Sequence, residues 1–258
     1  MLNYLTYPFQ TMRITQSYTG TTSHLPHMTG SPKEYALDEG GRDGGRDWLF
    51  CGCDAMRVTR LTGVGKPGTN ALYLTSAKPV NLANGKRSII TLQLVHPNDD
   101  DLCKLRDGQI IRRGEKICRE GNDGATGNHV HMAVGLGTII GTGWQQNSKG
   151  RWVLVTTGGP IKPEDAFFID PAFTTIRDAK GLDFKMLPKG KPAPGRYEVT
   201  SATLRVRKGT STNTLILGEL KHRERVEIVR TKKGLDGAYW GRTSVGWVCM
   251  DYMKKVGG

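Results

Sequence analysis

Apolar residues in this chain gather in short runs that glycine, proline and asparagine separate. Such runs, rich in Val, Ile, Leu and Thr, predict strands at 71–75, 88–95, 130–134 and 152–156. One segment, 163–169, predicts a helix, because Pro163 suits a first helical turn and Pro171 follows its end. The pattern therefore predicts a mainly β protein with an antiparallel sheet and little helix.

A second set of strand patterns follows a segment at 182–195 that is rich in proline, glycine and lysine. That composition is typical of an extended linker. The runs beyond it predict strands at 203–207, 225–230, 239–243 and 246–249. Short strands over so few residues suit a small β-barrel. We therefore predict a larger domain at 1–181, a linker at 182–195 and a barrel at 196–258.

Composition excludes some classes of protein. Of the 258 residues 37% are hydrophobic, and no apolar run reaches the length of about 18 residues that a membrane span needs, so we expect no membrane insertion. The first residues lack the basic and apolar parts of a secretory signal, which predicts a protein that accumulates in a cytoplasm. The five cysteines fit no disulfide framework, and we expect reduced thiols.

The net charge of +13 is concentrated toward the C-terminus. Residues 182–258 carry 16 Lys and Arg against 7 Asp and Glu. Such an excess favours a polyanionic partner, and nucleic acid, an anionic membrane or a wall that bears teichoic acid would each fit. The segment lacks a recognisable nucleic-acid-binding motif, so we do not expect a nucleic-acid partner.

The tripeptide His129-Val130-His131 carries the strongest chemical signal. On a strand, two imidazoles one residue apart project from the same side, and such a pair suits a zinc ion or one ligand with one acid–base group. The alternative is a pair of strand histidines without a task. His24, Asp38 and one of the two histidines would supply three ligands and leave a position for an activated water. His96 follows an apolar strand pattern and is a further catalytic candidate.

The ordered motifs Ser23-His24, Tyr35-Ala-Leu-Asp38, Val95-His96 and Gly127-Asn128-His129-Val130-His131 resemble the lysostaphin-type zinc endopeptidases. A glycine- and isoleucine-spaced stretch at 108–121 adds to the resemblance, which covers roughly residues 12–135. It implies that His24, Asp38 and His131 bind Zn²⁺. It implies further that His129 and His96 are catalytic, orienting a zinc-bound water and stabilising the oxyanion as a peptide bond of bacterial peptidoglycan is cleaved.

One spacing departs from the family's habit. Many members place the first histidine four residues before the aspartate, whereas 14 residues separate His24 from Asp38 here. The intervening segment contains His27, which is a second candidate for the first ligand. The Ser23-His24 context favours His24.

The C-terminal segment resembles a bacterial SH3-like domain through Leu204-Arg-Val-Arg207 and Gly246-Trp247-Val248. We expect Trp247 and Val248 in the barrel core, while Tyr239 and Trp240 could lie in the core or on a binding surface. The two-part layout resembles a bacteriophage endolysin of a Gram-positive host. It implies binding to peptidoglycan, with anionic wall polymers as possible further ligands, and action on the wall from the host cytoplasm after membrane breach. The alternative is a non-catalytic wall-binding or regulatory protein on the same fold.

Overall fold

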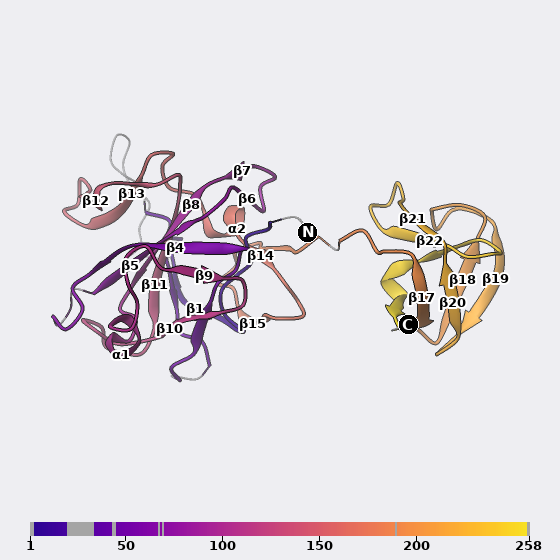
Figure 1. Cartoon of the computed structure of the whole chain (residues 1–258), viewed down its shortest axis with the longest axis horizontal. Coiled ribbons are helices and arrows are strands. Elements are labelled where there is room, and N and C mark those ends of the chain that lie inside the picture. Colours follow the sequence, from indigo (N-terminus) through magenta and orange to yellow (C-terminus); the bar gives the residue numbers. More distant parts are fainter. Residues whose placement is uncertain are drawn as a thin grey trace. The chain divides into compact units, whose positions relative to one another are not determined.

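The computed structural model describes residues 3–19, 34–42, 45–66, 68, 70–188 and 190–256. The chain forms two compact units, Met1–Leu187 and Pro188–Gly258, each built from its own strands (Figure 1). Both units consist mainly of antiparallel strands with little helix, as the sequence predicts. Within the described ranges, no helix is long and apolar enough to cross a membrane.

An eight-stranded sheet forms the centre of unit 1. All neighbouring strands in it are antiparallel except the first two, which are parallel. Its strands, in spatial order, are β15 (Thr175–Asp178), β1 (Thr11–Ser17), β2 (Leu37–Glu39), β11 (Val130–Leu136), β8 (Ile90–Val95), β5 (Ala71–Ser76), β4 (Ala55–Thr62) and β9 (Ile110–Arg112).

The two faces of this sheet pack against different layers. Leu37 and Met132 point from one face into the main hydrophobic core of the unit. Ala133 and Tyr73 point from the other face and pack against Leu154 of a separate hairpin. β5, β8 and β11 are therefore buried on both faces. Because side chains alternate between the two faces of a strand, most residues of these strands are apolar.

Smaller elements surround the sheet. They are the strand pairs β3 (Trp48–Phe50) with β10 (Lys116–Arg119), β6 (Val80–Asn81) with β7 (Arg87–Ser88), β12 (Ile139–Gln146) with β13 (Trp152–Thr156), β14 (Phe168–Ile169) with β16 (Lys185–Met186), and the helix α1 (Asp99–Leu102). The hairpin β12–β13 contributes Leu154 and so covers the second face of the sheet. Strand β16, Lys185–Met186, pairs with β14 and belongs to unit 1, although it lies in the segment 182–195 that was predicted as a linker.

The predicted helix at 163–169 was too long. Helix α2 (Pro163–Ala166) ends where Phe167 adopts an extended conformation, at φ −92° and ψ 138°. The next residues form β14, in which the amide of Phe168 donates to the carbonyl of Leu5 at 2.9 Å. Phe167, Phe168 and Ile169 are all buried. An extended segment buries all three in succession and takes its backbone hydrogen bonds from neighbouring strands, which a further helical turn would not allow.

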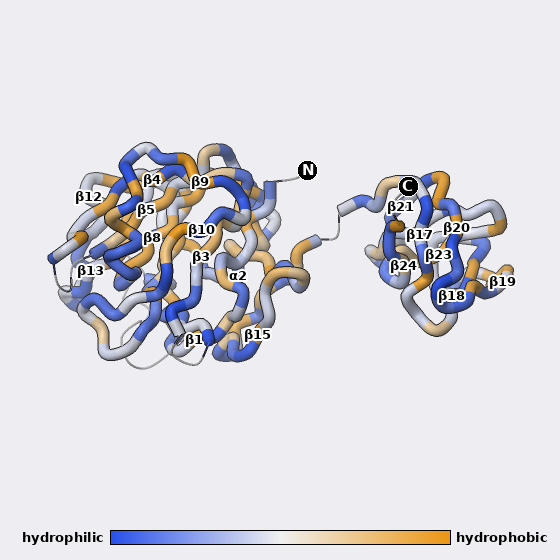
Figure 2. The backbone as a smooth tube through the Cα atoms, turned by 60° about the horizontal axis from the view of Figure 1, so that its bottom comes forward, coloured by the Kyte–Doolittle hydropathy of each residue, from blue (hydrophilic) through white to orange (hydrophobic). Residues whose placement is uncertain are grey.

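Unit 2 places two antiparallel sheets around one small core. Tyr197, Val199, Leu204, Ile228 and Val248 are among the buried residues of that core. Figure 2 shows hydrophobic and hydrophilic positions interleaved along the chain of both units. The first sheet has the order β20 (Arg225–Ile228), β17 (Gly195–Val199) and β24 (Met253–Lys255), and the second has the order β19 (Ile216–Lys221), β18 (Thr203–Arg207), β23 (Trp247–Cys249), β22 (Tyr239–Arg242) and β21 (Arg230–Lys233); a 3-10 helix spans Met250–Tyr252.

Candidate metal and catalytic site

Strands β2 and β11 bring Asp38 and His131 together. The two residues are direct partners in the antiparallel register, and Val95 of β8 lies opposite His131 on its other side. Their neighbours Leu37 and Met132 point into the core, so Asp38 and His131 project from the opposite face. A carboxylate and an imidazole 93 residues apart in sequence thus become neighbours through strand pairing.

Nδ1 of His131 lies 3.3 Å from Oδ1 of Asp38, and Nε2 on the other side of the ring lies 3.1 Å from Oε1 of Glu34. Burial alone would lower the pKa of His131, but the hydrogen bonds to Asp38 and Glu34 outweigh it and raise that pKa to about 9. A ring with this pKa is protonated at pH 7, and each of its nitrogens faces a side-chain oxygen, of Asp38 or of Glu34.

The pairing of Asp38 with His131 also fits a zinc site. Two ligands that bind a tetrahedral zinc ion at about 2.0–2.1 Å lie about 3.3–3.4 Å apart, and these two donor atoms are 3.3 Å apart. Imidazole nitrogen and carboxylate oxygen are both ligands that zinc accepts in proteins. Within the described ranges no group of three or more His, Cys, Asp or Glu side chains could hold a metal ion. Asp38 and His131 are a pair that could supply two ligands.

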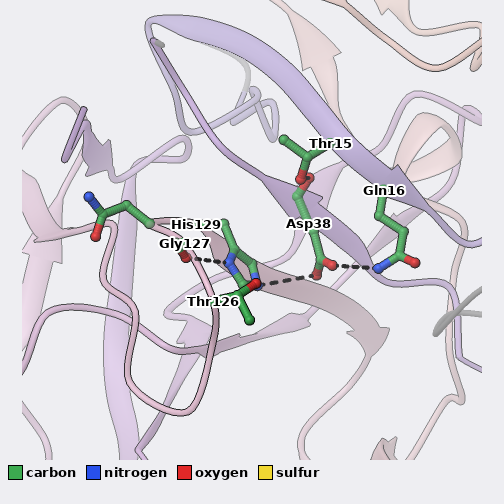
Figure 3. A pocket seen from close by; sticks show the side chains of 7 residues that line it. Thr15, Gln16, Asp38, Thr126, Gly127 and His129 are labelled. Atoms are coloured by element: carbon green, nitrogen blue, oxygen red, sulfur yellow. Dashed lines mark hydrogen bonds and ion pairs between the residues drawn. The ribbon is translucent and has the colours of Figure 1, made fainter. Parts of the chain in front are cut away.

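The second oxygen of Asp38 is held by a neighbouring strand. Nε2 of Gln16, on β1, donates to Oδ2 of Asp38 at 2.8 Å. Asp38 lies between Gln16 and His129 (Figure 3). These residues line an open pocket of about 400 Å³ together with Thr15, Thr126 and the loop 127–128. The Gln16 contact turns Oδ1 of Asp38 toward the two histidines.

His129 and His96 complete the cluster. Nε2 of His129 lies 3.9 Å from Oδ1 of Asp38, and the rings of His96 and His129 are 4.9 Å apart. Nδ1 of His129 lies 2.9 Å from the carbonyl of Gly127, and Nδ1 of His96 lies 2.5 Å from that of Asp123. Because a carbonyl only accepts, each Nδ1 carries the proton, and in the neutral rings Nε2 is the basic nitrogen.

The backbone around His96 is specialised. His96 has φ 69°, in the left-handed region that residues other than glycine seldom adopt, at a cost of about 1–2 kcal/mol. Gly121 passes so close that a Cβ on it would lie 2.4 Å from the carbonyl oxygen of His96. Burial, followed by the neighbouring His129 and His131, lowers the pKa of His96 despite its bond to Asp123. His96 is therefore neutral at pH 7.

Four of the five site residues expected from the sequence meet at one end of β2, β8 and β11: Asp38, His96, His129 and His131. His24, the expected first ligand, and its alternative His27 lie outside the described residues. The sequence interpretation missed Gln16 and Glu34. Glu34 stands four residues before Asp38, the spacing at which many lysostaphin-type enzymes place a ligand. That spacing is the signal that could have found it.

In unit 2 the aromatic expectations are partly confirmed. Val248 and Trp240 are buried, which answers the open question about Trp240. The expectation that Trp247 lies in the core was wrong, because Trp247 alternates with the inward-facing Val248 on β23 and is only partly buried. The guanidinium carbons of Arg230 and Arg242 lie 5.3 and 6.0 Å from its ring centre, within cation–π range.

No protein-family model matches this chain, and no curated protein sequence matches it. Among solved structures, an NMR solution structure of lysostaphin is similar at 11% identity and a TM-score of 0.36, over 96% of this chain and 91% of that one. A structure of the antimicrobial peptidase lysostaphin from Staphylococcus simulans is similar at 13% identity and a TM-score of 0.33, over 92% and 86%.

Proposed function

We propose that unit 1 is a zinc endopeptidase that hydrolyses peptide bonds of bacterial peptidoglycan, and that unit 2 binds the cell wall. The observation that carries the proposal is the 3.3 Å approach of His131 Nδ1 to Asp38 Oδ1, with two further histidines beside it at an open pocket. His24 is the proposed third protein ligand, with His27 as the alternative. Three protein ligands and one open position are the arrangement of catalytic zinc sites.

A zinc ion at this position would polarise the scissile carbonyl and lower the pKa of water in the site. His129 is placed to act as the general base, because its Nε2 faces Asp38 and can accept a proton from an attacking water. The resulting imidazolium can return that proton to the leaving amine. His96 is neutral and can orient the water through Nε2, while its backbone contact with Asp123 fixes the ring.

Unit 2 has the surface chemistry for a polymeric anionic wall. Unit 2, Pro188–Gly258, holds 15 of the 37 basic residues of the chain. Trp247, flanked by Arg230 and Arg242, offers a partly exposed aromatic ring beside two cations. We propose that this unit binds peptidoglycan, with anionic wall polymers as additional ligands.

As the setting we propose the cytoplasm of a phage-infected Gram-positive cell, from which the protein reaches the wall after membrane breach. No disulfide joins the five cysteines, all of which lie in the described ranges. Reduced thiols are typical of proteins made in a cytosol. Fractionation of infected cells before and after lysis would test this setting, and protein outside the membrane before lysis would contradict it.

The function is tested on purified Gram-positive cell walls with the full chain. We expect clearing of the wall suspension, loss of clearing with EDTA and recovery on addition of Zn²⁺. Mass spectrometry of the released fragments should show new peptide termini and intact glycan bonds. Wall binding without fragment release would favour the non-catalytic alternative, and full clearing by the metal-free protein would refute a metal-dependent mechanism.

A further inference from the structure

Glu34 is a buried carboxylate that contacts the proposed ligand His131. Its residue surface is 6% exposed, and its Oε1 lies 3.1 Å from Nε2 of His131. Burying a carboxylate costs free energy unless it is paired. The pairing of Glu34 with the imidazole compensates part of that cost and fixes one side of the ring.

The two nitrogens of His131 face opposite carboxylates. Asp38 lies at Nδ1 and Glu34 at Nε2. The ring of His129 and the pocket are on the Asp38 side. A metal ion that is shared with Asp38 therefore binds Nδ1 of His131. Glu34 lies on the far side of the ring, at Nε2, and does not face that ion.

We propose that Glu34 is a positioning residue that accepts the Nε2 proton of His131 and thereby directs the Nδ1 lone pair toward the metal. This inference rests on the proposed zinc site. When a metal ion takes the Nδ1 lone pair, the single proton of the neutral ring is on Nε2, and Glu34, whose carboxylate only accepts, is placed to receive it. Carboxylates that hold the outer nitrogen of a ligand histidine orient the ring and raise its basicity as a ligand.

Glu34 and Asp38 are close together in the sequence. Glu34 precedes Asp38 by four residues, just before β2, and the short connection between them places one carboxylate on each side of the imidazole. Asp38 is held in turn by Gln16 at Oδ2. In each proposed ligand a neighbouring side chain thus holds one polar atom, Oδ2 of Asp38 or Nε2 of His131. The other polar atoms, Oδ1 of Asp38 and Nδ1 of His131, face each other at the proposed metal position.

The test is the affinity of the full chain for Zn²⁺, measured by competition with a chromophoric chelator. We expect Glu34→Ala to weaken binding by about 10- to 100-fold. Glu34→Gln should lose less, because its amide oxygen can still accept from Nε2. The matched control is Glu120→Gln, the same change at a fully buried carboxylate whose neighbours are Asp47 and Gly41. It should bind zinc as the wild type does.

A second readout reports the tautomer directly. In zinc-loaded wild type, ¹⁵N NMR should show the His131 proton on Nε2, and Glu34→Ala should change the ¹⁵N shift of Nε2. Unaltered zinc affinity in Glu34→Ala, together with loss of binding in His131→Ala, would overturn the role of Glu34 and leave the zinc site in place. If the wild type itself binds no zinc, the proposed function fails and this inference fails with it.

Discussion

Glu120 provides a prediction whose size follows from the structure. Its side chain is fully buried, Oε2 accepts from the amide of Asp47 at 3.2 Å, and Oε1 has no hydrogen-bond partner among the described residues. Burial, followed by repulsion from Asp47 and Glu39, raises the pKa of Glu120 from 4.5 to about 8 although Arg13 opposes it. The folded protein therefore keeps this proton over a pH range in which the unfolded chain has lost it.

The sign and size of the effect follow by linkage. Because the folded-state pKa is higher, the free energy of unfolding falls as pH rises from about 4.5 to about 8 and then stays low. At about 1.4 kcal/mol per pKa unit, the penalty at pH 7 is on the order of 3 kcal/mol. Glu120→Gln removes the charge and retains an acceptor for the Asp47 amide. It should stabilise unit 1 by about this amount at pH 7 and change little at pH 4.

The assay is urea unfolding of the full chain at several pH values between 4 and 8, with wild type and variant compared at each. Asp107→Asn is the control, because it removes an exposed carboxylate from the same unit. The difference between Glu120→Gln and wild type should grow with pH. Parallel pH profiles for the two proteins would refute the assignment of the penalty to Glu120.

Three further predictions concern the site and the wall. Asp38→Ala and His131→Ala should lose bound zinc. His129→Ala should keep the metal and lose about 10²- to 10⁴-fold in the rate of wall hydrolysis. Metal analysis together with turbidity clearing checks both results, and loss of zinc in His129→Ala would contradict the role of His129. Gly121→Ala places a Cβ 2.4 Å from a backbone oxygen of His96, so it should lower stability by about 1–3 kcal/mol and reduce hydrolysis; a wild-type melting temperature and rate would contradict this. Binding of the full chain to purified walls should weaken with added NaCl and with Arg230→Ala; salt-independent binding would argue against an anionic ligand.

The strands that the sequence predicts best have either a continuous apolar run or a clear alternation of apolar and polar residues, as in β18, whose predicted bounds 203–207 are the observed ones. β5, β11 and β13 have nearly continuous apolar runs, and their predicted bounds agree within two residues. β1 was missed because Thr11, Arg13 and Gln16 interrupt its apolar positions. β12 was missed because its glycines 141 and 143 have positive φ values. The end of α2 could not be predicted, since the pairing of Phe168 with Leu5 comes from residues far apart in sequence.

Contacts between residues far apart in sequence are also the part of the candidate site that the sequence does not predict. The spacing of His129 and His131 predicts a shared face, and the structure places both rings near Asp38. The register of β2 against β11, which sets the distance between Asp38 and His131, depends on the whole sheet and has no local signal. Gln16 lies in a strand without a clear periodic pattern, so its contact with Asp38 emerges only from the fold. The spacing of Glu34 from Asp38 is visible in the sequence, whereas its contact with His131 is not.

The most direct test of the metal site is an anomalous difference map, at the zinc absorption edge, from crystals of the full chain grown with Zn²⁺. We predict one strong peak between Asp38 and His131, about 2.0–2.2 Å from Oδ1 of the first and Nδ1 of the second. A map with no peak at this position, from crystals of protein that clears cell walls, would contradict it.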